Sequence, residues 1–289
     1  MRKLLLVGLA CLFVFTVSGQ GYTQPLQVYG SLYSTVINFS DSSIKDDGWG
    51  ITGYASIKDG QYNSLELGVS QLHLDYKSEP DLDQTDFTIA YTNTDQLISH
   101  HAFRLGFHYI ISDDNVTDNG KIFFGKVTYF IPYEWNVGLE FDYSLYDNTS
   151  TDLHVYQFLP HAGFYLNHLI PTGTLYTESK FYYIHKDKNL GLSKDNFFSF
   201  EQSLNYYYRA FDAKAHAWVG EQIYAVKNAG FVVYNLADKY KGGLGIEVGY
   251  TFKNGLRLAF NLTNDWLKHV GYSDTVKQTV FTITVGTNF

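Results

Sequence analysis

From residue 26 onward, the chain consists largely of segments in which apolar and polar residues alternate. In residues 133–145 the odd positions are Tyr, Trp, Val, Leu, Phe, Tyr and Leu, whereas the even positions are Glu, Asn, Gly, Glu, Asp and Ser. Residues 244–253 and 256–265 show the same alternation. A helix would distribute these residues around its circumference, whereas the two-residue period of a β-strand sorts them into one apolar and one polar face. The pattern therefore predicts an all-β chain.

We expect about fourteen such strands (12–16 possible), separated by stretches rich in Asp, Asn, Gly, Ser and Lys, which favour turns. The expected strands are 26–40, 49–58, 62–76, 83–93, 98–112, 120–131, 133–147, 153–166, 173–186, 196–209, 213–226, 244–253, 255–266 and 275–289. The alternation slips near Ser70, which we interpret as a β-bulge. Residues 229–239 fit either a further strand or part of a long loop.

The connections between these segments alternate in length. Longer polar loops, such as 113–119 and 187–195, alternate with tight turns, such as Asn254-Gly255. Long loops on one side and short turns on the other are typical of outer-membrane barrels with an even number of strands. The expected strands are also about twice the usual ~5–6 residues, a length that suits a tilted strand crossing a bilayer. A soluble β-sandwich or β-solenoid is the alternative, but an open sheet of this size would expose long edges. We therefore predict a transmembrane antiparallel up-and-down β-barrel.

The N-terminal residues predict export from the cytoplasm. Basic residues Arg2 and Lys3 precede an apolar run over residues 4–17, and the small residues Ser18 and Gly19 follow it. This is the three-part layout of a secretory signal peptide. We expect residues 1–19 to be removed, with an approximate cleavage site, and residues 20–289 to form a single barrel domain. Removal would also take away Cys11, the single cysteine of the chain.

The C-terminal residues carry a likeness to a known class of proteins. Residues 276–289 read VKQTVFTITVGTNF, and steps of two back from Phe289 pass Thr287, Val285, Ile283 and Phe281. This segment resembles the C-terminal strand of bacterial outer-membrane β-barrel proteins, which ends in an aromatic residue after alternating apolar residues. Thr287 departs from the apolar or aromatic residue common at that position. The resemblance implies a porin-like fold of unspecified subfamily, and recognition of Phe281, Ile283, Val285 and Phe289 by the barrel assembly machinery.

If the apolar strand faces meet lipid, the opposite faces line the lumen. The side chains expected there include Arg104, Lys126, Glu134, Glu140, Asp142, Glu178, Lys180, Glu201, Glu247, Arg257, His100 and His108. Hairpin geometry around Pro132 should bring Lys126 roughly opposite Glu140. Separated basic and acidic side chains would create a field across an aqueous pore and select polar solutes. Alternatively, these charges pair and close the interior, or loop 227–243, which has an apolar centre, folds inward and plugs it.

The remaining composition narrows the function. A formal net charge of −8 argues against a nucleic-acid partner, and no nucleotide-binding fingerprint is present. We expect no catalytic residue, no metal site and no cofactor. We predict an outer-membrane channel of Gram-negative type for passive or weakly selective diffusion of small polar solutes, with outer-membrane lipid around it and an open oligomeric state. The alternatives are a non-conducting receptor or structural barrel with a plugged lumen, and a membrane-embedded hydrolase, which would need a base within hydrogen-bond reach of its nucleophile.

Overall fold

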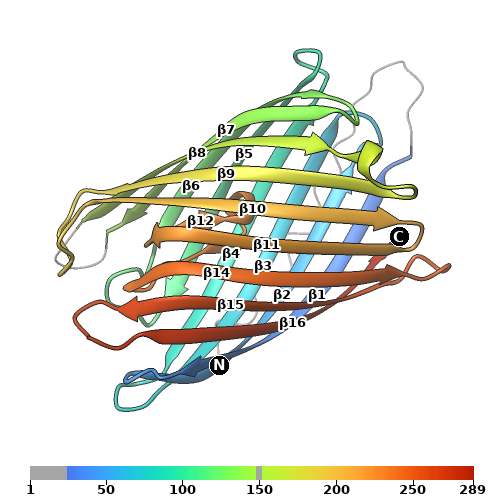
Figure 1. Ribbon diagram of the computed structural model, residues 1–289. Coiled ribbons are helices and arrows are strands. Elements are labelled where there is room, and N and C mark those ends of the chain that lie inside the picture. The colour runs from blue at the N-terminus through green and yellow to red at the C-terminus, as the bar shows by residue number, and fades with distance from the viewer. Residues whose placement is uncertain (1–24, 148–151) are drawn as a thin grey trace, which may run out of the picture.

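The computed structural model of the protein describes residues 25–147 and 152–289, which form one closed barrel of 14 antiparallel strands (Figure 1). The barrel strands are β1 (Gln27–Ser40), β2 (Lys45–Lys58), β3 (Asn63–Tyr76), β4 (Leu82–Thr94), β5 (His101–Ser112), β6 (Lys121–Ile131), β7 (Trp135–Tyr146), β8 (Leu153–Tyr165), β9 (Thr174–Lys186), β10 (Asn196–Tyr208), β11 (Phe211–Gln222), β14 (Asp238–Thr251), β15 (Arg257–His269) and β16 (Val276–Asn288). The short elements are η1 (Asn167–Leu169), β12 (Val226–Lys227), η2 (Asn228–Gly230) and β13 (Val232–Val233). The predicted signal peptide, residues 1–19, lies outside the described residues.

The barrel closes between its first and last strands. β1 pairs with β2 on one side and with β16 on the other, where Leu32 lies opposite Val285. Every other barrel strand pairs with its neighbours along the chain, and β11 pairs directly with β14. This closure confirms the predicted fold class. Within residues 25–147 and 152–289, no helix is long and apolar enough to cross a membrane.

The two ends of the barrel differ. At one end, which we call the short-turn end, β1 begins, β16 ends and compact turns such as 209–210 connect neighbouring strands. At the other, the long-loop end, the connections include residues 187–195 and 223–237. The turn at 41–44 is shorter than expected, because β2 begins at Lys45.

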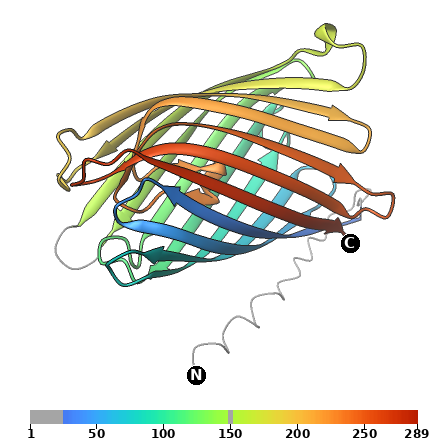
Figure 2. The same cartoon turned by 60° about the horizontal axis from the view of Figure 1, so that its bottom comes forward.

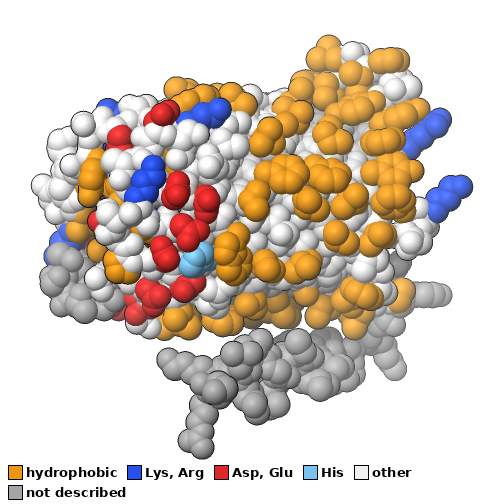
Figure 3. Space-filling view, turned by 90° about the horizontal axis from the view of Figure 1, so that it is seen from below, with side chains coloured by type: hydrophobic (Ala, Val, Ile, Leu, Met, Phe, Trp, Pro, Cys, Tyr) orange, Lys and Arg blue, Asp and Glu red, His pale blue; other side chains and the backbone are white. Residues whose placement is uncertain are grey.

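The outer surface of the barrel is apolar over much of its height. Exposed outward-facing side chains include Leu32, Val36, Phe200 and Ile246, as well as Phe281, Ile283 and Val285 of β16. Figure 3 shows such side chains spread over one part of the surface, with acidic side chains gathered beside them at one end. A bilayer core requires an apolar outer surface, which this band provides. It also requires that no backbone edge is left unpaired, and closure of the barrel meets this requirement.

The change of pattern near Ser70 is not a bulge. β3 pairs in unbroken register with β2 from Ser64 to Leu74, and its pairing with β4 is also unbroken. Val69 faces outward and is exposed, whereas Leu74 is buried inside the barrel. Beyond Ser70 the apolar residues point inward, because the inner face of β3 there packs against an apolar core, while polar residues such as His73 point outward.

The connection between β11 and β14, residues 223–237, folds into the barrel, and we call it the inward segment (Figure 2). Its first four residues, 223–226, are at most 1% exposed. The sequence analysis expected an inward loop at 227–243, but residues 238–243 belong to β14. Residues 229–239 are therefore mostly loop: they include part of η2 and the two residues of β13, and only their last two residues begin β14.

Candidate functional site

Hydrogen bonds to two separate parts of the wall hold the inward segment in the lumen. Gln157 of β8 pairs with the backbone of Val226: its Nε2 donates to the carbonyl oxygen at 2.7 Å, and its Oε1 accepts from the N–H at 3.1 Å. Asn235 donates through Nδ2 to Oε1 of Gln84 on β4 at 2.7 Å and to Oγ1 of Thr117 at 2.9 Å. Because buried amides are costly to leave unpaired, these bonds fix the position of the segment in the lumen.

The middle of the inward segment reaches the wall formed by β2, β3 and β5. The Phe231 ring meets the Tyr54 ring edge-on, with 5.5 Å between centroids. A Cβ atom placed on Gly68 would lie 2.9 Å from Phe231, so the glycine leaves the space that this ring fills. Arg104 donates to the carbonyl oxygen of Ala229 at 3.5 Å. The segment thus crosses the lumen from β11 to the opposite wall.

Apolar side chains close the lumen on the long-loop side of the inward segment. Residues 223–226 pack there against wall residues at the long-loop ends of their strands, all of them buried: Ile110, Ile122, Tyr146, Leu153, Val155, Ile184 and Phe197. This core leaves no polar path between the inward segment and the long loops among these residues. An apolar core therefore fills this part of the lumen.

The lumen is polar on the short-turn side of the inward segment. It holds a cavity of about 770 Å³ beneath the segment. Part of the cavity wall carries mainly hydroxyl groups, from Thr35, Thr52, Thr263, Thr282 and Thr284, and the rest carries charged side chains, including Glu66, Arg104, Lys126, Glu201 and Lys214. A second cavity of about 420 Å³ shares Lys214 and Glu247 with the first and extends to the turn at 209–210. These two adjoining cavities, which we call the polar vestibule, lie between the turn at 209–210 and the inward segment.

Many charges in the lumen are paired. Arg104 forms an ion pair with Glu66. Lys180 lies 3.2 Å from Glu178. Lys126 stands opposite Glu140 in the register of β6 and β7. Yet, in the described part of the chain, no carboxylate oxygen lies within 4.0 Å of its ammonium.

At the short-turn mouth, Arg257 binds Asp212 at 2.5 Å and Glu247 at 3.0 Å. Arg257 is held there by two carboxylates, and Arg209 and Lys214 line the same cavity. The vestibule therefore presents fixed charges of both signs to a solute.

Of the twelve side chains that the sequence predicted in the lumen, ten lie on the inner face of the barrel and two do not. Those on the inner face of the barrel are Arg104, Lys126, Glu140, Asp142, Glu178, Lys180, Glu201, Glu247, Arg257 and His108. His100 and Glu134 instead lie exposed in short turns. The reason is that β5 begins only at His101 and β7 only at Trp135, so the preceding residues have left the strand pattern.

The sequence analysis missed a buried polar cluster at the long-loop rim. Ser42 Oγ lies 2.8 Å from Nε2 of His269, whose Nδ1 lies 2.6 Å from Oδ1 of Asp238. Serine, imidazole and carboxylate follow one another as in a hydrolytic triad. However, Ser42 is 5% exposed, lines neither cavity described above, and its Oγ already accepts hydrogen bonds from the N–H groups of Ile44 and Lys45. We interpret the cluster as a structural clamp, completed by the Lys45–Asp238 ion pair.

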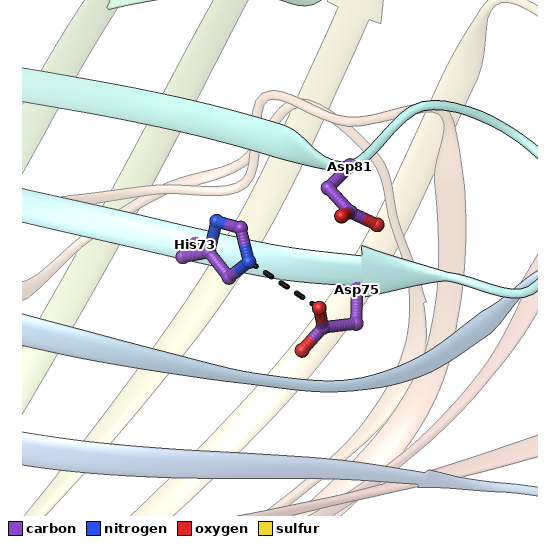
Figure 4. Close-up of side chains that lie close together, drawn as sticks. All are labelled: His73, Asp75 and Asp81. Atoms are coloured by element: carbon purple, nitrogen blue, oxygen red, sulfur yellow. Dashed lines mark hydrogen bonds and ion pairs between the residues drawn. The ribbon is translucent and has the colours of Figure 1, made fainter.

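A second group missed from the sequence lies on the outer surface. The side chains of His73, Asp75 and Asp81 bring one potential metal-ligating atom each within 4.8 Å of one another (Figure 4). His73 Nε2 lies 3.3 Å from Asp75 and its Nδ1 lies 2.9 Å from Asp83. Both imidazole nitrogens therefore already face carboxylates, and a protonated His73 would offset part of the acidic charge without a metal.

Comparison with known proteins places the chain by its fold. No sequence model of a known protein family matches it, and no curated protein sequence matches it. The toluene transporter TbuX of Ralstonia pickettii is similar in structure, with 8% identity, a TM-score of 0.58 and coverage of 92% of this chain and 90% of that one. A mutant of the monoaromatic hydrocarbon channel TodX has 10% identity, a TM-score of 0.54 and coverage of 91% and 90%. A FadL homologue of Pseudomonas aeruginosa has 8% identity, a TM-score of 0.51 and coverage of 91% and 89%.

At these identities the likeness concerns the barrel architecture alone. One of these proteins is a toluene transporter and another is a monoaromatic hydrocarbon channel, and each of the three structures covers at least 91% of this chain.

Proposed function

We propose that this protein is an outer-membrane channel for small polar solutes, that its structure represents a closed state, and that the inward segment is the closure. The observation that carries the proposal is the polar vestibule of about 770 Å³ that ends at a single connecting segment. Residues 1–19 would direct export and then be removed, and the C-terminal strand with Phe281, Ile283, Val285 and Phe289 would be recognised by the barrel assembly machinery. Lipid would cover the apolar outer band.

The connectivity of the barrel supports a removable closure. The inward segment joins β11 to β14, and these two strands pair with each other directly along the wall. Displacement of the segment therefore breaks no strand pairing of the barrel. Fourteen strands enclose more space than the ~8-stranded barrels whose interiors side chains fill, so removal of the segment should leave an aqueous path.

The charges of the vestibule support selection among polar solutes. Fixed charges in a low-dielectric wall act strongly on a solute, because little water screens them. Passage would then require no covalent chemistry.

The decisive experiment replaces residues 224–236 with a short Gly/Ser turn and measures conductance in a planar bilayer. The unmodified barrel should be mostly closed, and the variant should show stable openings. A matched control replaces the exposed loop residues 78–80 with two glycines, which leaves the inward segment in place and should leave the barrel closed. A folded, heat-modifiable variant without conductance would overturn the channel proposal.

The apolar core on the long-loop side favours a second candidate function, a non-conducting surface receptor or structural barrel with a plugged lumen. That reading predicts that the variant without the inward segment folds less stably and conducts no ions. The same experiment therefore distinguishes the two functions.

A further inference from the structure

The geometry points to a binding site for a small organic cation around Lys227. We propose that this site takes a solute with a primary or quaternary ammonium group, and that Lys227 occupies it as an internal competitor in the closed barrel. The inference rests on the proposed function, because it names the class of solute that the vestibule would admit.

The ammonium of Lys227 lies in a cage of aromatic rings. Its Nζ atom is 5.0 Å from the ring centroid of Trp218, 5.5 Å from that of Tyr234 and 5.8 Å from that of Tyr182. Glu201 completes the cage with a carboxylate oxygen at 3.3 Å. Aromatic faces attract cations within about 6 Å through their quadrupole, and cages of this composition recognise quaternary ammonium groups.

The cage is held in shape by contacts other than those to Lys227. The indole Nε1 of Trp218 donates to Oδ1 of Asp265 at 3.0 Å. Gly243 leaves room for this carboxylate, since a Cβ atom there would collide with it. Tyr234 stacks on Tyr240 with 4.4 Å between ring centroids. The rings therefore stay in place when the lysine side chain leaves.

The cage is reachable from the vestibule. Glu201, Lys227 and Tyr234 line the cavity of about 770 Å³, whereas Trp218 and Tyr182 are buried beside them and do not line it. Among residues 25–147 and 152–289, the contacts of the lysine ammonium are its ion pair and its three rings, and the flexible stem can withdraw into the cavity. A cationic solute arriving from the short-turn mouth can thus replace the Lys227 ammonium beside the rings and Glu201, whose other carboxylate oxygen lies 4.0 Å from Lys180.

The test measures binding of choline to the refolded full chain in detergent by titration calorimetry. Lys227→Ala should bind choline at least about tenfold more tightly than the unmodified chain, because a tethered competitor acts at ~mM effective concentration. Lys121→Ala is the matched control: it removes a lysine that lines neither cavity and pairs with Asp147 at 3.1 Å, and it should leave choline affinity unchanged. Lys227→Gln, which keeps most of the stem, should shift affinity in the same direction if the alanine variant fails to fold.

Two further measurements identify the chemistry of the cage. Adding Trp218→Leu to the Lys227→Ala chain should weaken choline binding by at least about threefold. The neutral isostere 3,3-dimethyl-1-butanol should bind much more weakly than choline. Equal binding of the alcohol, or no tightening in Lys227→Ala relative to Lys121→Ala, overturns the proposal. These binding results do not depend on conductance. Failure of choline binding therefore does not affect the conductance test of the channel, and absence of conductance does not affect the binding test.

Discussion

Truncation of Tyr224 to alanine tests whether the inward segment closes the lumen. The side chain is 1% exposed, and its ring packs against Tyr146 with 5.9 Å between centroids. When the segment is displaced, the Tyr224 ring has already left this core. The substitution therefore destabilises the closed state and leaves the free energy of the open state unchanged. Removing a buried aromatic side chain costs about 3–5 kcal/mol, and ~1.4 kcal/mol is a tenfold change in an equilibrium constant. The ratio of open to closed barrels should therefore rise at least roughly hundredfold.

The open probability of single barrels in a planar bilayer measures this ratio. Phe200→Ala is the matched control, because it removes a comparable ring that is 44% exposed on the outer face of β10 and should not change the open probability. A Tyr224→Ala barrel that folds with reduced thermal stability, yet opens no more often than Phe200→Ala, would refute the assignment of the inward segment as the closure.

Three further predictions concern the lumen, the short turns and the rim. In the variant without the inward segment, Lys126→Glu should move the reversal potential under a salt gradient toward cation selectivity, whereas Lys126→Gln should move it less. If the reversal potential of the open pore does not shift, Lys126 does not line the path of the ions. Partial burial alone would raise the pKa of Asp59, but hydrogen bonds from Asn63 and Gln61 lower this pKa to about 2. The ionised carboxylate therefore stabilises its turn fully at pH values above its ordinary pKa of 3.8. This stabilisation is lost as the pH falls through about 2. Asp59→Asn should accordingly lower the thermal midpoint at pH 6 and match the unmodified chain near pH 2, and a pH-independent difference would contradict this reasoning. Lys45→Met should destabilise the barrel by about 3–5 kcal/mol, because it removes the lysine partner of the buried Asp238 and leaves the carboxylate with His269 alone. An unchanged heat-modification midpoint would argue against the clamp.

The barrel could be predicted from the sequence because strand periodicity is a local property. Each residue of a strand faces one side or the other by its position alone, so alternation over residues 133–145 sufficed to predict β7 and its lipid-facing side. The hairpin at Pro132 likewise sufficed to place Lys126 opposite Glu140, and the register of β6 and β7 confirms it. The same local reasoning misplaced His100, which lies just before its strand begins.

The polarity of the interior could not be predicted in this way. Near Ser70 the apolar residues change from the outer to the inner face of β3 without any break in register. Alternation alone cannot distinguish such a reversal from a bulge, because both shift the apolar positions by one residue. Only the apolar core inside the long-loop half explains why Leu74 points inward.

The contacts that define the candidate site depend on closure of the barrel. Ser42 and His269 are 227 residues apart in the chain and meet because β1 and β16 join. Lys227 meets Trp218, Tyr182 and Glu201 because a connection between neighbouring strands turns into the lumen rather than away from it. The sequence by itself determined the strands, their faces and the pairing across tight hairpins, since these follow from the period and from short-range geometry. The tertiary structure alone decided which loop fills the lumen and which charges meet there, since these depend on the packing of residues far apart in the chain.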